Sequence, residues 1–311
     1  YGLVGSEMCI RDSVGAVGEQ KTKPTQHSVK ELQGLGIRPD IIVGRSNTKL
    51  EEDIATKIAF FADIPRECVI SAPDARSIYD VPMVFLEQKL PELVEKRLGL
   101  KPKAPDLTQW KDFADRISNG SETVEIALIG KYTDLKDSYI SHEESLRYAG
   151  ALLGCKVKIR WIEAPDLEDS GNTESLEGVN GVLVPGGFGS RGSEGKIMSA
   201  KWARESNTPY LGVCFGFQLA TVEFARNVLG LKNANSSELD PDGEHSVIDI
   251  LPEQEGVENM GATMRLGDHE VAISGGKAME LYKNSTAYER HRQLYEIKPE
   301  YISQNEEKGM K

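Results

Sequence analysis

Several features that would place this chain in a special class are missing from its sequence. No apolar run approaches the roughly 18 residues that a membrane-spanning helix needs, and no basic stretch followed by an apolar one forms a secretion leader. We therefore expect a cytoplasmic protein without a membrane partner.

Cysteine is scarce and widely spaced. The four cysteines, Cys9, Cys68, Cys155 and Cys214, form no CxxC pair, so the sequence predicts neither a zinc site nor a disulfide framework. Reduced thiols are the default state in the cytoplasm. We expect no metal site in this chain and no prosthetic group.

Positive charge is in deficit. Lysine and arginine number 37 against 49 aspartates and glutamates, which gives a net charge of -12 at pH 7. Because affinity for nucleic acid depends on clustered basic residues, this balance argues against a nucleic-acid partner. It still allows a local basic pocket for a small phosphorylated ligand. The 311 residues, 39% hydrophobic and 28% charged, are typical of a soluble protein of roughly two domains.

Strands alternate with helices in the first third of the chain. Residues 40–46 and 67–71 are short, β-branched and bounded by turn residues, which predicts strands. Helical spacing of apolar residues predicts helices over 25–34, 49–62 and 81–98. This alternation predicts a parallel α/β domain over residues 14–98.

A second α/β series follows a break in composition. Residues 99–122 are rich in proline and turn formers, which predicts an interdomain linker. Beyond them we expect a domain over 123–311 with a doubly wound sheet, which places ligands at the carboxyl ends of its strands. Its expected helices cover 137–153, 194–206 and 214–229, and its expected strands cover 124–130, 156–163, 181–185, 209–213, 246–252 and 262–273, with a turn at Gly267-Asp268.

One motif places a nucleophile between a strand and a helix. Gly212-Val-Cys214-Phe-Gly216 follows the apolar strand at 209–213, and its two glycines relieve crowding at a sharp turn. The helix N-terminus below Cys214 favours the thiolate, and the amides of the turn can stabilise an oxyanion. The alternative is that Cys214 is a small buried residue at the end of a strand.

A glycine-rich loop follows the neighbouring strand. Residues 184–192, Val-Pro-Gly-Gly-Phe-Gly-Ser-Arg-Gly, close one strand and lead into a helix. So many glycines permit close approach of a ligand to exposed backbone amides. Such a loop alone is more often a turn than a site. Two of them after neighbouring strands of one sheet favour a binding site.

These two segments resemble a known family. Residues 181–192 (GVLVPGGFGSRG) and 209–220 (PYLGVCFGFQLA) are similar to class I glutamine amidotransferases. Further similarity narrows the resemblance to the CTP synthases, and it extends from about Gly18 to Tyr301 through the segments 18–32, 233–238, 261–267 and 289–292. It implies two doubly wound parallel-sheet domains, a partial P-loop-type amidoligase domain followed by a flavodoxin-like class I glutamine amidotransferase domain.

The resemblance implies roles for the second domain. CTP synthases aminate UTP to CTP with ATP and with ammonia released from glutamine, and Cys214 corresponds to the nucleophile. Backbone amides of Gly187 and Phe215 would stabilise the oxyanion, and Glu238 would accept the α-ammonium of glutamine. Without the resemblance, Glu238 is better interpreted as a solvated carboxylate. The residues implied to bind glutamine are Gly187, Phe215, Gly216, Phe217, Gln218 and Glu238.

The resemblance also implies a nucleotide site in the first domain. Two lysines just before a helix N-terminus form a compact anion site, and Lys57 would add a cation, although a lone lysine is usually solvated. Ala75 would contact ATP through its backbone. The residues implied to bind UTP, or CTP as inhibitor, are Lys21, Thr22, Lys23, Pro24, Thr25, Gln26 and Lys57. ATP and Mg²⁺ would serve the full enzyme, with GTP as a candidate activator and a homotetramer as its assembly.

The chain departs from the family in several places. It contains neither a G-x-x-x-x-G-K-[ST] phosphate loop nor the Phe-His-Pro-Glu motif that supplies the catalytic His and Glu, and its five histidines are His27, His142, His245, His269 and His291. We therefore expect a truncated, inactive fragment that lacks a general acid for the leaving ammonia. Residues 8–13 resemble a translated sequencing adapter, so we expect residues 1–13 to be an artefact.

A further departure concerns the glutamine carboxylate. Leu294 stands where the family has an arginine that binds this carboxylate, and leucine cannot pair with it. Either Arg292 takes over this role, or the segment is misread.

Two other functions stay open from the sequence. Residues 123–311 could form a stand-alone glutaminase or an amidotransferase subunit of another pathway, although the Lys-Thr-Lys-Pro-Thr-Gln segment at 21–26 argues against this. Alternatively, the chain is a non-catalytic nucleotide-binding fragment.

Overall fold

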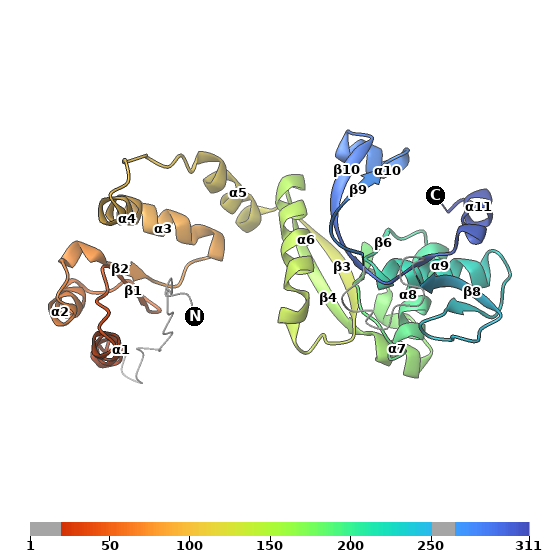
Figure 1. Ribbon diagram of the computed structural model, residues 1–311, viewed down its shortest axis with the longest axis horizontal. Coiled ribbons are helices and arrows are strands. Elements are labelled where there is room, and N and C mark those ends of the chain that lie inside the picture. The colour runs from red at the N-terminus through yellow and green to blue at the C-terminus, as the bar shows by residue number, and fades with distance from the viewer. Residues whose placement is uncertain (1–19, 251–264, 311) are drawn as a thin grey trace. The chain divides into compact units, whose positions relative to one another are not determined.

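The structure is a computed structural model that describes residues 20–250 and 265–310. The chain divides into a first unit, Tyr1–Gly120, and a second unit, Ser121–Lys311 (Figure 1). Over the described ranges, no helix is long and apolar enough to cross a membrane.

The first unit is built around two parallel strands, β1 (Ile42–Arg45) and β2 (Val69–Ala72). The apolar face of α2 covers them, with Ala55, Ile58 and Ala59 packed against Val69. Its helices are α1 (Lys23–Gly34), α2 (Glu52–Ala62), η1 (Arg66–Cys68), η2 (Ile78–Asp80), α3 (Val81–Glu87), α4 (Leu90–Leu98) and α5 (Thr108–Asn119).

The single helix predicted over 81–98 is wrong, because two helices occupy this range. Helix α3 ends at Glu87, Lys89 takes a left-handed conformation with φ 58°, and α4 begins at Leu90. Pro91 explains the break. Its ring would clash with the carbonyl of Glu87 four residues earlier, and it has no amide hydrogen to continue the helix.

Helix α5 lies inside the segment 99–122 that we expected to be a linker. Its Trp110 donates from Nε1 to the Tyr79 carbonyl at 2.8 Å, and its Phe113 ring lies 5.5 Å from the Tyr79 ring. Ala114 beside them is buried. The apolar residues of α5 follow helical spacing, but the prolines before them led us to predict a linker. The segment instead contains a regular helix that packs against the rest of the first unit.

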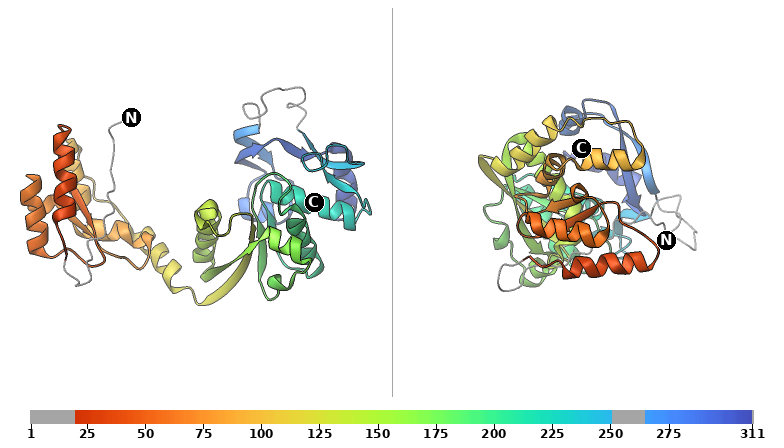
Figure 2. Two further views of the ribbon diagram at one scale, coloured as in Figure 1. Left: turned by 90° about the horizontal axis from the view of Figure 1, so that it is seen from below. Right: turned by 90° about the vertical axis from the view of Figure 1, so that its left-hand side faces the viewer.

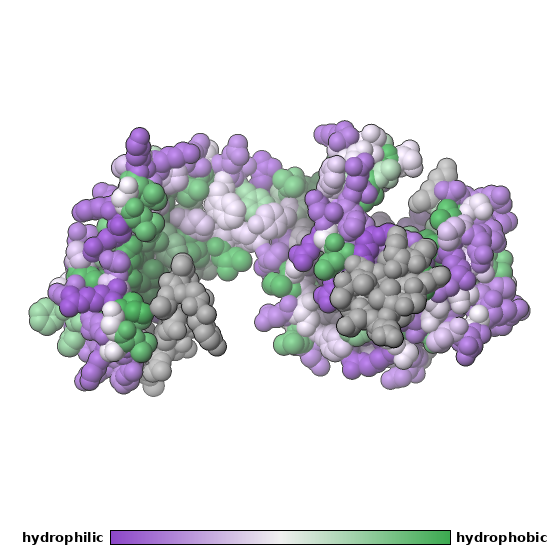
Figure 3. Space-filling model, in the orientation of Figure 1, coloured by the Kyte–Doolittle hydropathy of each residue, from purple (hydrophilic) through white to green (hydrophobic). Residues whose placement is uncertain are grey.

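The first unit exposes much apolar surface, which shows as green patches on its visible face (Figure 3). Clusters of exposed apolar side chains are typical of surfaces that contact other molecules. The large apolar residues exposed in this unit include Leu35, Val43, Phe60, Phe61, Ile78 and Leu98.

The second unit contains a four-stranded parallel sheet in the order β4-β3-β5-β6. Chain order reverses direction between β3 and β5, so this is the switch point at which such sheets bind ligands. The strands are β3 (Glu122–Gly130), β4 (Cys155–Glu163), β5 (Gly181–Val184) and β6 (Tyr210–Gly212). Parallel α/β architecture, as predicted, is confirmed.

Helices cover both faces of this sheet (Figures 1 and 2). Alternate residues of β3 point to opposite sides: Ala127 and Ile129 pack with α7 and α8 residues, whereas Leu128 packs with Tyr139 and α6. The helices are η3 (Lys136–Tyr139), α6 (Ile140–Leu153), α7 (Ala164–Ser170), η4 (Glu174–Leu176), α8 (Ser193–Glu205) and α9 (Phe215–Asn227). Helix α7 directly follows β4, in a segment where the sequence predicted no helix.

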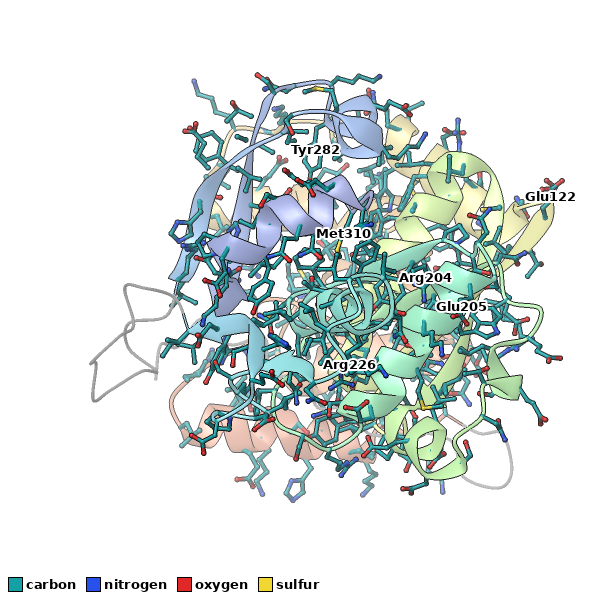
Figure 4. The ribbon with its side chains drawn as sticks, turned by 90° about the vertical axis from the view of Figure 1, so that its right-hand side faces the viewer. Glu122, Arg204, Glu205, Arg226, Tyr282 and Met310 are labelled. Atoms are coloured by element: carbon teal, nitrogen blue, oxygen red, sulfur yellow. The ribbon has the colours of Figure 1, made fainter. Side chains whose placement is uncertain are left out.

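Ion pairs fix α8 against α9. Arg204 of α8 contacts the carboxylate of Glu223 on α9 at 2.8 Å, and Glu223 is buried. Arg226 of α9 contacts Glu194 of α8 at 2.9 Å. Figure 4 labels Arg204 and Arg226 on these neighbouring helices. The two helices carry the glycine-rich loop and the cysteine turn at their N-termini, so their pairing fixes the geometry of the site.

The rest of the second unit forms two smaller sheets. One has the order β11-β8-β7, and the other is an antiparallel ribbon of β9 and β10. The elements are β7 (Ala234–Ser236), β8 (His245–Ile250), β9 (Arg265–Ala272), α10 (Gly276–Tyr282), β10 (Thr286–Gln293), β11 (Tyr295–Ile297) and α11 (Pro299–Glu307).

The turn predicted at Gly267-Asp268 is wrong. Strand β9 runs through both residues, with Gly267 opposite His291 and Asp268 opposite Arg290. Gly267 has a φ of 93°, a conformation that glycine allows inside a strand without ending it. The parts of the expected strands at 251–252 and 262–264 lie outside the described residues.

Candidate active site

Cys214 lies at a sharp turn between strand β6 and helix α9. Strand β6 ends at Gly212 and α9 begins at Phe215, and Cys214 has φ 51° and ψ -109°. A non-glycine residue in this conformation is strained and persists only when its surroundings fix it. Here the Val213 amide donates to the Val184 carbonyl at 2.9 Å and anchors the turn to β5. The cysteine side chain is left exposed.

The two glycines of the motif are required by packing. A Cβ at Gly216 would lie 2.1 Å from the Val184 carbonyl oxygen, and one at Gly212 would lie 2.5 Å from the Phe217 amide nitrogen. Both distances are far inside van der Waals contact. The start of α9 therefore rests directly on β5 and β6, which raises the thiol above the sheet edge.

The glycine-rich loop lies beside this thiol. A Cβ built on Gly186 would be 3.5 Å from the Cys214 Cβ, and one built on Gly187 would be 3.9 Å from Cδ1 of Phe215. The loops after β5 and β6 thus meet at one edge of the sheet, as the strand order requires.

The electrostatics of Cys214 favour the neutral thiol. Its Sγ donates to the Arg292 carbonyl at 3.6 Å. Although one side of the sulfur reaches solvent, the loss of hydration on its packed side is the dominant effect and raises its pKa. The Phe215 amide and the charges of Lys196 and Arg292 lower this pKa, whereas Glu238 raises it. The start of α9 therefore lowers the pKa of Cys214, as expected, but by less than desolvation raises it.

Two lysines that we did not predict hold the glycine-rich loop. Lys131, directly after β3, donates from Nζ to the carbonyls of Phe188 at 2.6 Å and Gly189 at 3.0 Å. Lys196 of α8 donates to the Pro185 carbonyl at 3.4 Å. In the sequence, only their positions could have indicated a role in the site. Lys131 follows a predicted strand, and Lys196 lies in the first helical turn after the loop.

Both lysines also lie near the Phe215 ring, with Nζ 5.5 Å from its centre for Lys131 and 5.3 Å for Lys196. Such contacts are attractive for a cation. Burial nevertheless lowers the pKa of Lys131, and it lowers the pKa of Lys196 to about 8 with help from the charge of Lys131.

The residues implied to bind glutamine fall into two groups. Glu238 lies at the loop, where its Oε1 accepts from the Gly189 amide at 2.7 Å. Gln218 is buried, and its Nε2 donates to the Tyr295 carbonyl at 2.9 Å. Cys214, Gly187, Phe215 and Glu238 thus share one site, whereas Gln218 ties α9 to β11, Gly216 is used for packing, and Phe217 is exposed.

No histidine of the described residues contacts Cys214 by a hydrogen bond or shifts its pKa. His269 and His291 face each other across β9 and β10, with ring centres 5.3 Å apart. His142 has a glutamate, Glu144, two residues on, but it lies on α6 and stacks against Tyr139 at 6.3 Å.

Six of the residues implied to bind a nucleotide, at positions 21–26, lie at or just before the start of α1. Thr22 is buried at the N-cap between exposed Lys21 and Lys23, and it accepts from Nε2 of Gln26 at 2.9 Å. Pro24 and Thr25 belong to the first turn of α1. Gln20 donates to the Lys49 carbonyl at 3.0 Å and so ties this segment to the loop after β1.

Other members of that set are more separate. Lys57 is exposed on α2, and Ala75 is exposed in the loop after β2. Within the ranges that the structure describes, no three His, Cys, Asp or Glu side chains are grouped to hold a metal ion.

Comparisons with known proteins match both units. The family described as CTP synthase N-terminus matches residues 7–100, and the family described as Glutamine amidotransferase class-I matches residues 134–311. The CTP synthase of Pyrococcus abyssi is 52% identical over 295 residues, which are 94% of this chain and 55% of that protein. The CTP synthase of Desulfitobacterium hafniense is 49% identical over 299 residues, 96% of this chain and 56% of that protein.

The chain thus spans about half the length of these curated relatives. A solved structure, described as Trypanosoma brucei CTPS glutaminase domain with bound acivicin, aligns with a TM-score of 0.54 and 36% identity. The alignment covers 60% of this chain and 72% of that one.

Proposed function

The chain belongs to the class I glutamine amidotransferase family and carries the domain pair of the CTP synthases, and from this we propose that Cys214 attacks the side-chain amide of glutamine. The observation that carries the proposal is the strained turn that holds an exposed Cys214 beside the Gly186–Gly187 loop. Glu238 supports it, because a carboxylate at this loop suits the α-ammonium of an amino acid.

The chemistry proposed for this site is acyl transfer. The Cys214 thiolate forms a C–S bond to the amide carbon, and the oxygen takes up the electron pair of the carbonyl. We propose that the amides of Gly187 and Phe215 stabilise this oxyanion. Its collapse breaks the C–N bond and gives a thioester, and the nitrogen leaves as ammonia after it gains a proton. Water then hydrolyses the thioester.

The proton transfers need a general acid and base. Because no histidine of the described residues contacts Cys214, we propose that this chain alone is acylated without efficient turnover. Arg292 is the candidate partner for the glutamine carboxylate, since its charge reaches Cys214 and Leu294 carries none.

For the whole enzyme we propose amination of UTP to CTP with ATP and Mg²⁺, inhibition by CTP and activation by GTP. A cytoplasmic homotetramer and the domain division at 14–98, 99–122 and 123–311 belong to the same proposal. Residues 1–13 lie outside the described residues, and their assignment as an artefact also stays a proposal.

Acivicin labelling tests the nucleophile. We expect acivicin to modify the peptide that contains Cys214, and excess glutamine to slow the reaction, because both compete for one site. Mass spectrometry after digestion measures the adduct. Cys214→Ala should abolish it, whereas Cys155→Ala, which removes a partly buried thiol elsewhere, should leave it unchanged. Modification that persists in Cys214→Ala would refute the proposal.

Glutamine turnover separates the alternatives. Sustained release of ammonia by this chain, lost in Cys214→Ala and unaffected by nucleotides, would favour a stand-alone glutaminase. Labelling without turnover fits the CTP synthase proposal.

Nucleotide binding tests the first unit. We propose that Lys21 and Lys23, which flank buried Thr22 at the start of α1, bind the triphosphate of UTP. The double substitution Lys21→Ala/Lys23→Ala should weaken UTP binding, measured by titration calorimetry, by about tenfold or more, because two charge-assisted contacts are lost. Lys30→Ala, on the same helix, should change it less than about twofold. Equal effects of both variants would contradict this site.

A further inference from the structure

Lys196 is almost completely buried, whereas the lysines of folded proteins are mostly exposed. Only 1% of its surface is exposed, and it is among the largest fully buried side chains of the described residues. Moving an ammonium group out of water costs free energy unless hydrogen bonds or an opposite charge compensate for the lost hydration. Because so little of the side chain is exposed, we expect any role in the site to act through the groups that surround it.

No carboxylate of the described residues forms an ion pair with this ammonium. The charged or titratable groups that face it are Lys131, from the end of β3, and Cys214, from the turn before α9. Those that face Cys214 are Lys196, Arg292 and Glu238. The field of Lys196 is therefore not cancelled locally, and an anion at Cys214 is the charge it would favour.

Lys196 also fixes the orientation of the loop. Its Nζ donates to the Pro185 carbonyl at 3.4 Å and lies 3.7 Å from a Cβ built on Gly187. In a trans peptide the carbonyl and the amide hydrogen point in opposite directions. Holding the Pro185 oxygen toward α8 therefore turns the Gly186 amide away from Lys196. Since Gly186 and Gly187 rotate freely, this contact limits a peptide flip.

We propose that Lys196 is a positioning residue for the Cys214 reaction, whose buried ammonium favours the thiolate and holds the glycine-rich loop in place. This role deepens the proposed function and rests on Cys214 being its nucleophile. The same buried charge lowers the free energy of unfolding of the second unit. A side chain that only fills space would not have this effect, so stability provides a second test of the role.

Alkylation of Cys214 by iodoacetamide tests the electrostatic part. The thiolate forms a C–S bond while the C–I bond breaks and iodide leaves, so no general acid is needed. Rates at Cys214 are followed by mass spectrometry across a pH series. Lys196→Met should slow the reaction near pH 7, where the Lys196 ammonium of wild type is charged, by about three- to tenfold, the effect of one nearby charge. The two rates should converge as the pH rises past about 8, because wild-type Lys196 then loses its proton and its charge.

Two further variants complete the test. Lys196→Gln retains a donor for the Pro185 carbonyl but not the charge, so it should slow the reaction near pH 7 in the same way even where Lys196→Met fails to fold. Lys201→Met makes the same change at an exposed position of α8 and should leave the rate at pH 7 unchanged. A folded neutral variant that reacts at pH 7 as fast as wild type would overturn the proposal.

The alkylation test of Lys196 and the acivicin test of the proposed function can fail independently of each other. Slower alkylation at pH 7 in Lys196→Met, together with no acivicin adduct in wild type, would support the coupling of Lys196 to Cys214 and reject the glutamine reaction. Glutamine-protected acivicin labelling with an unchanged alkylation rate in Lys196→Met would reject the role of Lys196 alone.

Discussion

Replacing Gly216 by alanine is expected to lower the free energy of unfolding of the second unit by about 3–5 kcal/mol. The new Cβ would lie 2.1 Å from the Val184 carbonyl oxygen and 2.8 Å from its carbon. These are backbone atoms of a central strand, so neither can rotate away. Helix α9 must move off β5, and the Cys214 turn must move with it.

Urea denaturation followed by circular dichroism measures this loss, and the rate of acivicin labelling measures the displacement of the turn. Gly34→Ala is the control, because a Cβ there meets nothing within 4 Å and Gly34 is also helical. That change should leave the second unit unaffected. A loss below about 1 kcal/mol in Gly216→Ala would show that α9 does not rest on β5 as described.

Lys196→Met is expected to stabilise the second unit by about 1–3 kcal/mol near neutral pH, since it removes a buried charge and keeps the volume. The pKa of Lys196 is about 8 in the fold against 10.5 in its usual range. A lowered pKa means that the folded state binds the proton more weakly than the unfolded state. The penalty is therefore full below about pH 8 and disappears as the pH rises toward 10.5.

The advantage of Lys196→Met over wild type should accordingly shrink across that interval. Urea denaturation of both proteins at several pH values measures it, with Lys201→Met expected to track wild type throughout. An advantage independent of pH would mean that Lys196 gains stability from shape alone. A variant that is more stable but less reactive would be the trade expected of a strained active site.

The sequence by itself determined the features that depend on near neighbours. Alternating strands and helices fixed the parallel α/β class, and the pattern Gly212-x-Cys214-x-Gly216 predicted the sharp turn that the structure contains. Even the break between α3 and α4 was readable from Pro91, although we predicted one helix there. These features follow from steric rules that act within about four residues.

Tertiary structure alone decided which groups face the thiol. The Arg292 carbonyl that accepts from Cys214 is 78 residues away in the chain, and Gln218 contacts Tyr295 instead of facing the loop. Lys131 and Lys196 look like ordinary solvated lysines in the sequence, yet both are buried around Phe215. Burial and charge depend on what distant segments bring to a point in space, and no local spacing encodes that.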